Sequence, residues 1–188
     1  FNRSRLDAES IRDSLLFVGG DLDETPGGVH PFPPQHTWGW TQHNPFVANY
    51  ESRRRSIYLM QQRLKKNPYL ALFDGADPSS STGVRLPSTT PLQALFAMND
   101  PLAHSQSTRF AQRILASGSD DQLRVTAAYQ LAFSRPPLPE EQHECQEFLT
   151  TYRKRLSDLK VPADQIEIKA WSALARSLMG SNEFIYVD

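Results

Sequence analysis

Apolar side chains recur every three or four residues along much of the chain, which is the spacing of one helix face. The first such stretch contains Ala8, Ile11, Leu15 and Val18. Asp7 stands before it, where a side-chain oxygen caps a helix start, and Gly19-Gly20 follows it as a stop signal. The pattern therefore predicts an amphipathic helix near the N-terminus.

The C-terminal half repeats this helical pattern between clear start and stop signals. Thr90-Pro91-Leu92-Gln93 fits a capping box, and Asp100-Pro101 ends one helix and starts the next, which runs to Ser117-Gly118. Asp120 caps a further helix that carries Leu123, Ala127, Ala128 and Leu131. We expect four or five consecutive helices with short connections, and hence a helical bundle over residues 88–188.

The last two helices have the most regular apolar stripes. Pro139-Glu140-Glu141 opens a helix whose stripe is Cys145, Phe148, Leu149, Tyr152, Leu156 and Leu159. The final helix starts at about Asp164 and is expected to bury Ala170, Trp171, Leu174, Ala175 and Leu178. The fold class predicted is mainly α.

The N-terminal half is less regular. Residues 21–51 are rich in proline, glycine and aromatic side chains, and we expect a long ordered loop there. Ser56–Gln61 is the best strand candidate, so at most one short strand or hairpin is expected. Asn67-Pro68 predicts a short helix through Phe73, and residues 77–83 predict a polar loop. We interpret residues 1–188 as a single domain.

Composition limits the function classes. The 188 residues carry 20 basic and 21 acidic side chains, a formal charge of −1, so no basic stripe indicates nucleic-acid binding. The single cysteine, Cys145, permits neither an intramolecular disulfide nor a cysteine-based haem or metal motif. The first residues have neither an initiator methionine nor an apolar run, so we expect a piece of a longer protein, with no membrane segment.

Several phrases occur in a distinctive order across nearly the whole chain. They are Arg5-Leu6-Asp7-Ala8-Glu9 with Ile11-Arg12-Asp13, Gly19-Gly20 with Leu22-Asp23, Gly27-Gly28, Arg54-Arg55-Ser56-Ile57-Tyr58, Phe73-Asp74, Ser88 to Leu95 with Asn99, Ala132-Phe133 with Arg135-Pro136-Pro137, and Ser181 to Tyr186. This order closely resembles the C-terminal domain of unknown function of large secreted planctomycete-type proteins that also carry a cytochrome-c-like domain.

The resemblance implies a secreted or cell-envelope protein (periplasmic or extracellular) and leaves the activity open. It implies haem only in the upstream part of such a parent protein, and no cofactor in this fragment. The partners it suggests are the upstream domains of the same protein and polysaccharide. Docking onto the parent's cytochrome is a further alternative.

The irregular loop holds the first candidate sites. His30, His36 and His43, with Asp21 and Asp23, offer nitrogen and oxygen ligands for a divalent metal, but no helical ligand spacing supports them, so no metal is predicted. Trp38 and Trp40, with Phe32 and Phe46, could form a stacking platform for sugar rings. We favour the alternative that these aromatic side chains anchor the loop to the bundle.

Charged residues provide the remaining candidates. Arg55 and Arg85 could bind an anionic ligand, although a structural ion pair between Arg55 and Asp74 is favoured. Asp74, Asp77, Asp100 and Glu183 are the acids to inspect for paired-carboxylate chemistry.

Two nucleophile-bearing features have simpler structural explanations. Ser88-Thr89-Thr90 fits a role in helix capping, and Cys145 fits buried packing. Whether the chain is an enzyme stays open, with the balance against it. A non-catalytic docking domain is favoured over a carbohydrate-active or carbohydrate-binding module.

Overall fold

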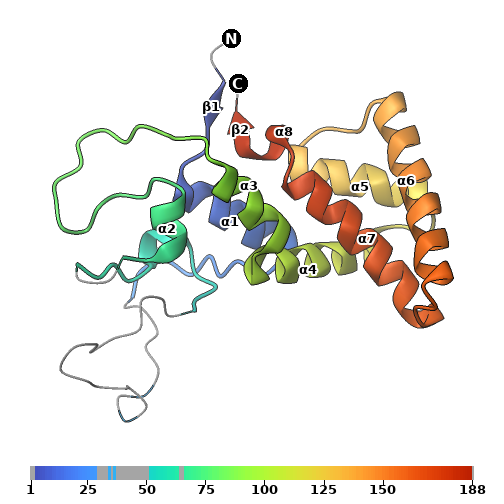
Figure 1. Cartoon of the computed structure of the whole chain (residues 1–188), viewed down its shortest axis with the longest axis horizontal. Coiled ribbons are helices and arrows are strands. Elements are labelled where there is room, and N and C mark those ends of the chain that lie inside the picture. The colour runs from blue at the N-terminus through green and yellow to red at the C-terminus, as the bar shows by residue number, and fades with distance from the viewer. Residues whose placement is uncertain (1–2, 29–33, 35, 37–50, 64–65, 188) are drawn as a thin grey trace.

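A computed structural model describes residues 3–28, 34, 36, 51–63 and 66–187, and the fold is mainly helical (Figure 1). The elements are β1 (Ser4–Arg5), α1 (Ala8–Gly19), a 3-10 turn (Ser56–Tyr58), α2 (Pro68–Leu72), α3 (Pro91–Asn99), α4 (Pro101–Ser117), α5 (Asp121–Phe133), α6 (Pro139–Asp158), α7 (Ala163–Met179), α8 (Asn182–Ile185) and β2 (Tyr186–Val187). The predicted fold class is confirmed. None of the helices in the described part of the chain is long and apolar enough to cross a lipid bilayer.

Helix α7 is central to the bundle. It packs most extensively against α4 and also contacts α6, α5 and α3. The five residues predicted for its inner face, Ala170, Trp171, Leu174, Ala175 and Leu178, are all buried, and Trp171 is 0% exposed. The core therefore forms around α4 and α7, and α1, α5 and α6 contribute buried side chains to the same cluster.

The predicted helix starts and stops are present. Asp7 accepts a hydrogen bond from the Ser10 N–H at 2.7 Å and begins α1, while Gly20 ends it in the left-handed conformation, with φ of 72°. Asp100 and Asp120 cap α4 and α5 in the same way as Asp7, through the N–H groups of Leu102 and Leu123. Local hydrogen-bonding chemistry thus determines these boundaries.

The stripe of α6 is confirmed except at its end. Cys145, Leu149 and Leu156 are buried, whereas Leu159 is 67% exposed. The helix ends at Asp158, so the apolar periodicity no longer applies to Leu159. Val161, beyond the turn, packs against the core instead.

The strand predicted at Ser56–Gln61 is wrong, because Ser56–Tyr58 forms a 3-10 turn. Side chains of α1, instead of a neighbouring strand, form hydrogen bonds with the backbone of residues 52–56. Asp13 accepts hydrogen bonds from the Ser56 N–H and hydroxyl at 2.8 and 2.7 Å, and Arg12 donates to the carbonyls of Ser52 and Arg54. The apolar character of residues 57–60 gave no sign of these side-chain partners.

The one strand pair among the described residues joins the two ends of the chain. β1 and β2 are antiparallel, with Ser4 opposite Val187 and Arg5 opposite Tyr186. The Leu6 N–H extends the ladder by donating to the Ile185 carbonyl at 2.8 Å. Both termini consequently lie side by side at one end of the molecule (Figure 1).

Candidate functional site

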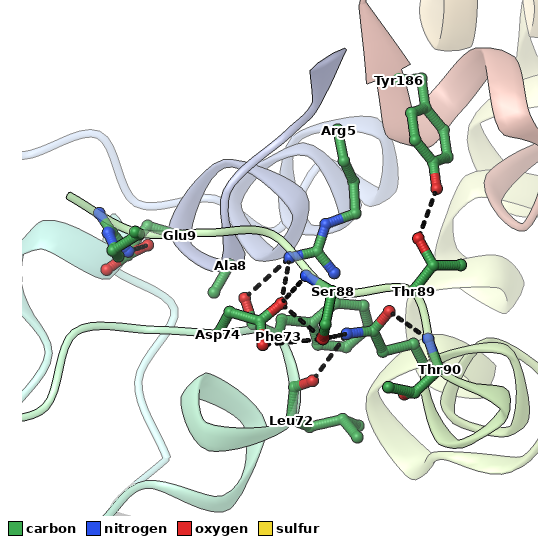
Figure 2. Close-up of polar contacts among 12 residues, drawn as sticks. Arg5, Ala8, Glu9, Leu72, Phe73, Asp74, Ser88, Thr89, Thr90 and Tyr186 are labelled. Atoms are coloured by element: carbon green, nitrogen blue, oxygen red, sulfur yellow. Dashed lines mark hydrogen bonds and ion pairs between the residues drawn. The ribbon is translucent and has the colours of Figure 1, made fainter. Parts of the chain in front are cut away.

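A partly buried polar cluster lies where β1, the end of α2 and the start of α3 meet (Figure 2). Arg5 Nη2 donates to Asp74 Oδ2 at 2.7 Å and to the Phe73 carbonyl at 3.2 Å. Ser88 donates to the same carboxylate through its N–H at 2.7 Å and through its hydroxyl at 2.8 Å. We call Arg5, Asp74 and Ser88 the Arg5 cluster.

The conformation and charge of Asp74 fit this environment. Its φ of 60° is left-handed, which aspartate and asparagine tolerate better than most residues. Burial alone would raise the pKa of Asp74, but the Ser88 N–H and hydroxyl and the Arg5 guanidinium hold this pKa below its ordinary value. The carboxylate is therefore kept ionised by its neighbours.

Further hydrogen bonds next to the Arg5 cluster involve α3 and β2. Gln93 Nε2 donates to the Leu72 carbonyl at 2.9 Å, and Gln93 Oε1 accepts from the Thr90 N–H at 3.2 Å. The hydroxyls of Thr89 and Tyr186 are 3.3 Å apart. The cluster thus joins three segments that are far apart in the sequence (Figure 2).

A groove of about 740 Å³ opens beside the Arg5 cluster, between α3, α7 and the β1–β2 pair. Its polar lining includes Arg5, Thr89, His104, Arg176 and Tyr186. Its apolar lining includes Phe73, Ala94, Ala97, Met98 and Ile185. No aspartate or glutamate belongs to the lining formed by the described residues, so the charged side chains facing this groove are basic.

The outer face of α3, next to the groove, is apolar and exposed. Leu92 is 63% exposed, Leu95 48% and Met98 63%, and Met98 also lines the groove. Isolated exposed apolar residues are common on proteins, but three on one nine-residue helix form a patch.

The predicted ion pair between Arg55 and Asp74 is wrong. Asp74 pairs with Arg5, and Arg55 is exposed beside Asp13 and Glu24, in a shallow depression at α1. The physical reason is that the bound Ser56 backbone fixes residue 55 over α1, while β1 brings Arg5 to Asp74.

The other charged candidates are engaged separately. Arg85 pairs with Glu9 at 2.7 Å, and Asp77 pairs with Lys66 at 2.8 Å. Glu183 and Glu141 both receive hydrogen bonds from Arg135, at 2.6 and 2.7 Å, and Asp100 caps α4. Each candidate acid therefore has its own structural partner, and the structure does not assemble them into one catalytic pair.

The histidine, aspartate and aromatic candidates of the N-terminal loop lie only partly within the described residues. His30, His43, Trp38 and Trp40 lie outside them, as do Phe32 and Phe46, and His36 is exposed. Asp21 binds Arg53 at 3.2 Å and Arg109 at 3.4 Å, and Asp23 accepts from the Thr25 N–H. Among the described residues, no group of three potential ligands could hold a metal ion.

The two nucleophile-bearing features, Ser88-Thr89-Thr90 and Cys145, are engaged in structural contacts. The Ser88 hydroxyl donates to Asp74, and Thr90 precedes α3 as its N-cap. Cys145 is 6% exposed and its Sγ lies 4.0 Å from the Tyr129 hydroxyl. Burial raises the pKa of the Cys145 thiol, so thiolate chemistry is disfavoured there.

The structure also reveals arginines to which the sequence gave no role. Arg5, Arg12 and Arg135 each donate to two or more partners, and at least one partner of each lies far away in the sequence. The available signal was their position within the distinctive phrases, where Arg12 precedes an aspartate and Arg135 precedes a proline. That signal marks the arginines without identifying their partners.

Comparisons with known proteins identify a family but no activity. Neither the curated proteins nor the solved structures contain a match to the chain. A family model, PSD1, described as "Protein of unknown function (DUF1553)", matches residues 1–149, well over half of the 188 residues. The chain therefore belongs to the PSD1 (DUF1553) family of proteins of unknown function.

Proposed function

We propose that this chain is a non-catalytic docking domain of a secreted, multidomain cell-envelope protein, and that a neighbouring domain of the same polypeptide covers the outer face of α3. The observation that carries the proposal is the exposed apolar patch Leu92, Leu95 and Met98. Exposed apolar patches on otherwise well-packed domains mark interaction surfaces. Haem, in this proposal, belongs to another part of the parent protein.

The position of the termini favours a neighbouring domain as the occupant. Arg5 of β1 and Met98 of α3 line the same groove, and β2 lies beside β1. Segments that precede or follow these strands in a longer polypeptide would leave the domain at this end. A neighbouring domain would then be close to α3 without a long linker.

The charged groups also fit a structural role. Asp74, Asp77 and Glu183 are each held by a basic partner, and the Arg5 cluster supports the segment leading into α3. Such ion pairs fix geometry without performing chemistry. Their effect here is to present α3 in one defined orientation.

Hydrogen exchange followed by mass spectrometry tests the proposal. The α3 amides should exchange more slowly in the longer protein than in the isolated chain of residues 1–188. Equal exchange in the two proteins would overturn the proposal. Protection that increases with the concentration of the isolated chain would also overturn it, because a second copy would then be the occupant.

A matched pair of variants locates the contact. Leu95→Ser in the longer protein should speed α3 exchange several-fold, because covering a half-exposed leucine contributes about 1 kcal/mol. Leu123→Ser on α5 is the control, since Leu123 is 53% exposed and α5 lies apart from α3. An equal response to both substitutions would contradict a contact at α3.

A further inference from the structure

The groove beside α3 has donors and positive charge without a matching acid. Arg176 of α7 lines the groove, and none of the salt bridges formed among the described residues involves it. Its Nη1 lies 2.6 Å from His104 Nδ1. An arginine in a mainly apolar groove without a carboxylate partner can bind an anion through its guanidinium donors.

The tautomer of His104 follows from its two partners. His104 Nε2 lies 3.0 Å from the Met98 carbonyl, which can only accept, so Nε2 carries the proton. Nδ1 therefore accepts from Arg176. The neutral ring orients the guanidinium without balancing its charge, which leaves the positive charge of Arg176 facing the groove.

Arg5 supplies a second, independent observation in the same groove. Its side chain is 5% exposed, and its Nε and Nη1 atoms are buried without a hydrogen-bond partner among the described residues. A buried N–H group that lacks an acceptor is destabilising. The hydroxyls of Thr89 and Tyr186 line the groove next to Arg5. They lie 3.3 Å apart, so the hydrogen bond between them is long and weak. The two hydroxyls are consequently the donors that this wall offers to a ligand, and the enclosed Arg5 guanidinium adds positive charge behind them.

The remaining lining determines the rest of the ligand. Ala94 and Ala97 of α3 and Ile185 before β2 offer small apolar contacts, and Met98 adds an adaptable one. A volume of about 740 Å³ is within the range typical of small-molecule sites. The site thus combines one anion-binding fork with an apolar wall.

We propose that this groove binds a small organic carboxylate with a compact apolar body. The carboxylate lies against Arg176, whose planar fork matches it, and the apolar body packs on Ala97 and Met98. The hydroxyls of Thr89 and Tyr186 favour further oxygen atoms on the ligand. This site shares Met98 with the outer face of α3, whereas Arg176 and Ala97 line the groove without belonging to that face. The docking proposal does not depend on ligand binding in the groove.

Three probes of equal shape and different charge test the head group. Phenylpropionate, phenylpropionamide and phenylpropylamine are titrated into the isotope-labelled chain, and amide chemical shifts are followed by NMR. Phenylpropionate should shift the amide signals of Ala97, Met98 and Gly180 and should bind with a dissociation constant at least tenfold lower than that of the amide. The amine should leave these signals unchanged. Equal affinity for all three probes, the absence of phenylpropionate binding, or shifts confined to other residues would overturn the proposal.

Variants then assign the recognition to Arg176. Arg176→Gln should abolish the preference for the carboxylate, and Arg176→Lys should retain part of it, because the charge remains while the fork is lost. Arg155→Gln, which removes one positive charge from the exposed surface of α6, should leave the affinity unchanged. If Arg176→Gln folds normally and still prefers phenylpropionate, or if Arg155→Gln has the same effect as Arg176→Gln, the assignment is wrong.

Discussion

Replacing Asp74 with asparagine should destabilise the domain in a pH-dependent way. Asparagine keeps the size of the side chain and tolerates the φ of 60°, so the substitution isolates the charge. It leaves the Arg5 guanidinium, only 5% exposed, without its carboxylate. Hydrogen bonds to charged groups contribute about 1.5–3 kcal/mol, and the partial exposure of Asp74 places the expected loss at about 2 kcal/mol.

Urea unfolding followed by circular dichroism measures this loss. A loss of about 2 kcal/mol in a domain of this size should lower Tm by roughly 4–8 °C. Asp77→Asn is the matched control, since Asp77 and its partner Lys66 are both more than one-third exposed and such surface pairs contribute little. The Asp77 variant should unfold almost like the wild type.

The pH dependence distinguishes the charge from the shape of the side chain. The pKa of Asp74 is lowered in the folded state, although burial opposes the shift, because Ser88 and Arg5 bind the ionised form. Its stabilising contribution is therefore complete above the unfolded-state pKa of about 3.9 and is lost as the pH falls through the lower folded-state value. The difference between wild type and Asp74→Asn should shrink below about pH 4. A difference that is absent at pH 7, or equal at pH 7 and pH 3, would refute this reasoning.

Three other substitutions or measurements probe separate features of the domain. Arg135→Met should cost about 1–2 kcal/mol in urea unfolding, because it leaves two partly exposed glutamates without their shared partner, whereas Lys154→Met on the surface of α6 should cost little. Equal effects would exclude a structural role for the arginine. Cys145 should react with a thiol reagent at least a hundredfold more slowly in the native protein than in urea, since burial raises its pKa and blocks access. Rapid native labelling would show that the α6 packing opens easily. Gly20→Ala should destabilise the domain by about 1–2 kcal/mol, because φ is 72° and a new Cβ would lie 2.9 Å from an arginine side-chain carbon, while Gly83→Ala should be neutral in open space. Both are measured by thermal melting, and a neutral Gly20→Ala would contradict the strained geometry.

The sequence predicted those features that are determined locally. Helix boundaries at Asp7, Asp100 and Asp120 depend on a side-chain cap a few residues away, and the α7 face depends on periodicity, so both were confirmed. The failures at Ser56–Gln61 and at the Arg55–Asp74 pair have a different origin. In each case a long-range partner was decisive: Asp13 for Ser56, and Arg5 for Asp74. Spacing along the chain contains no record of such pairings.

The candidate site shows the same division. The sequence named the acids and Arg85 as candidates, but their partners became known only from the structure. The groove was not anticipated, because Arg5, Met98 and Arg176 come from three distant segments. Its full lining arises only when β1 pairs with β2 and places Arg5 beside α3.

The pairing of β1 with β2 also has a consequence for the order of folding. Ser4 meets Val187 across almost the full length of the chain, and closing so long a loop has a high entropic cost that only a preformed bundle can offset. Helices α4 to α7 are close in sequence and can associate first, whereas β1 can attach only after α8 has been placed. We therefore expect the strand pair, and the Arg5 contacts that depend on it, to form last during folding and to open first during unfolding.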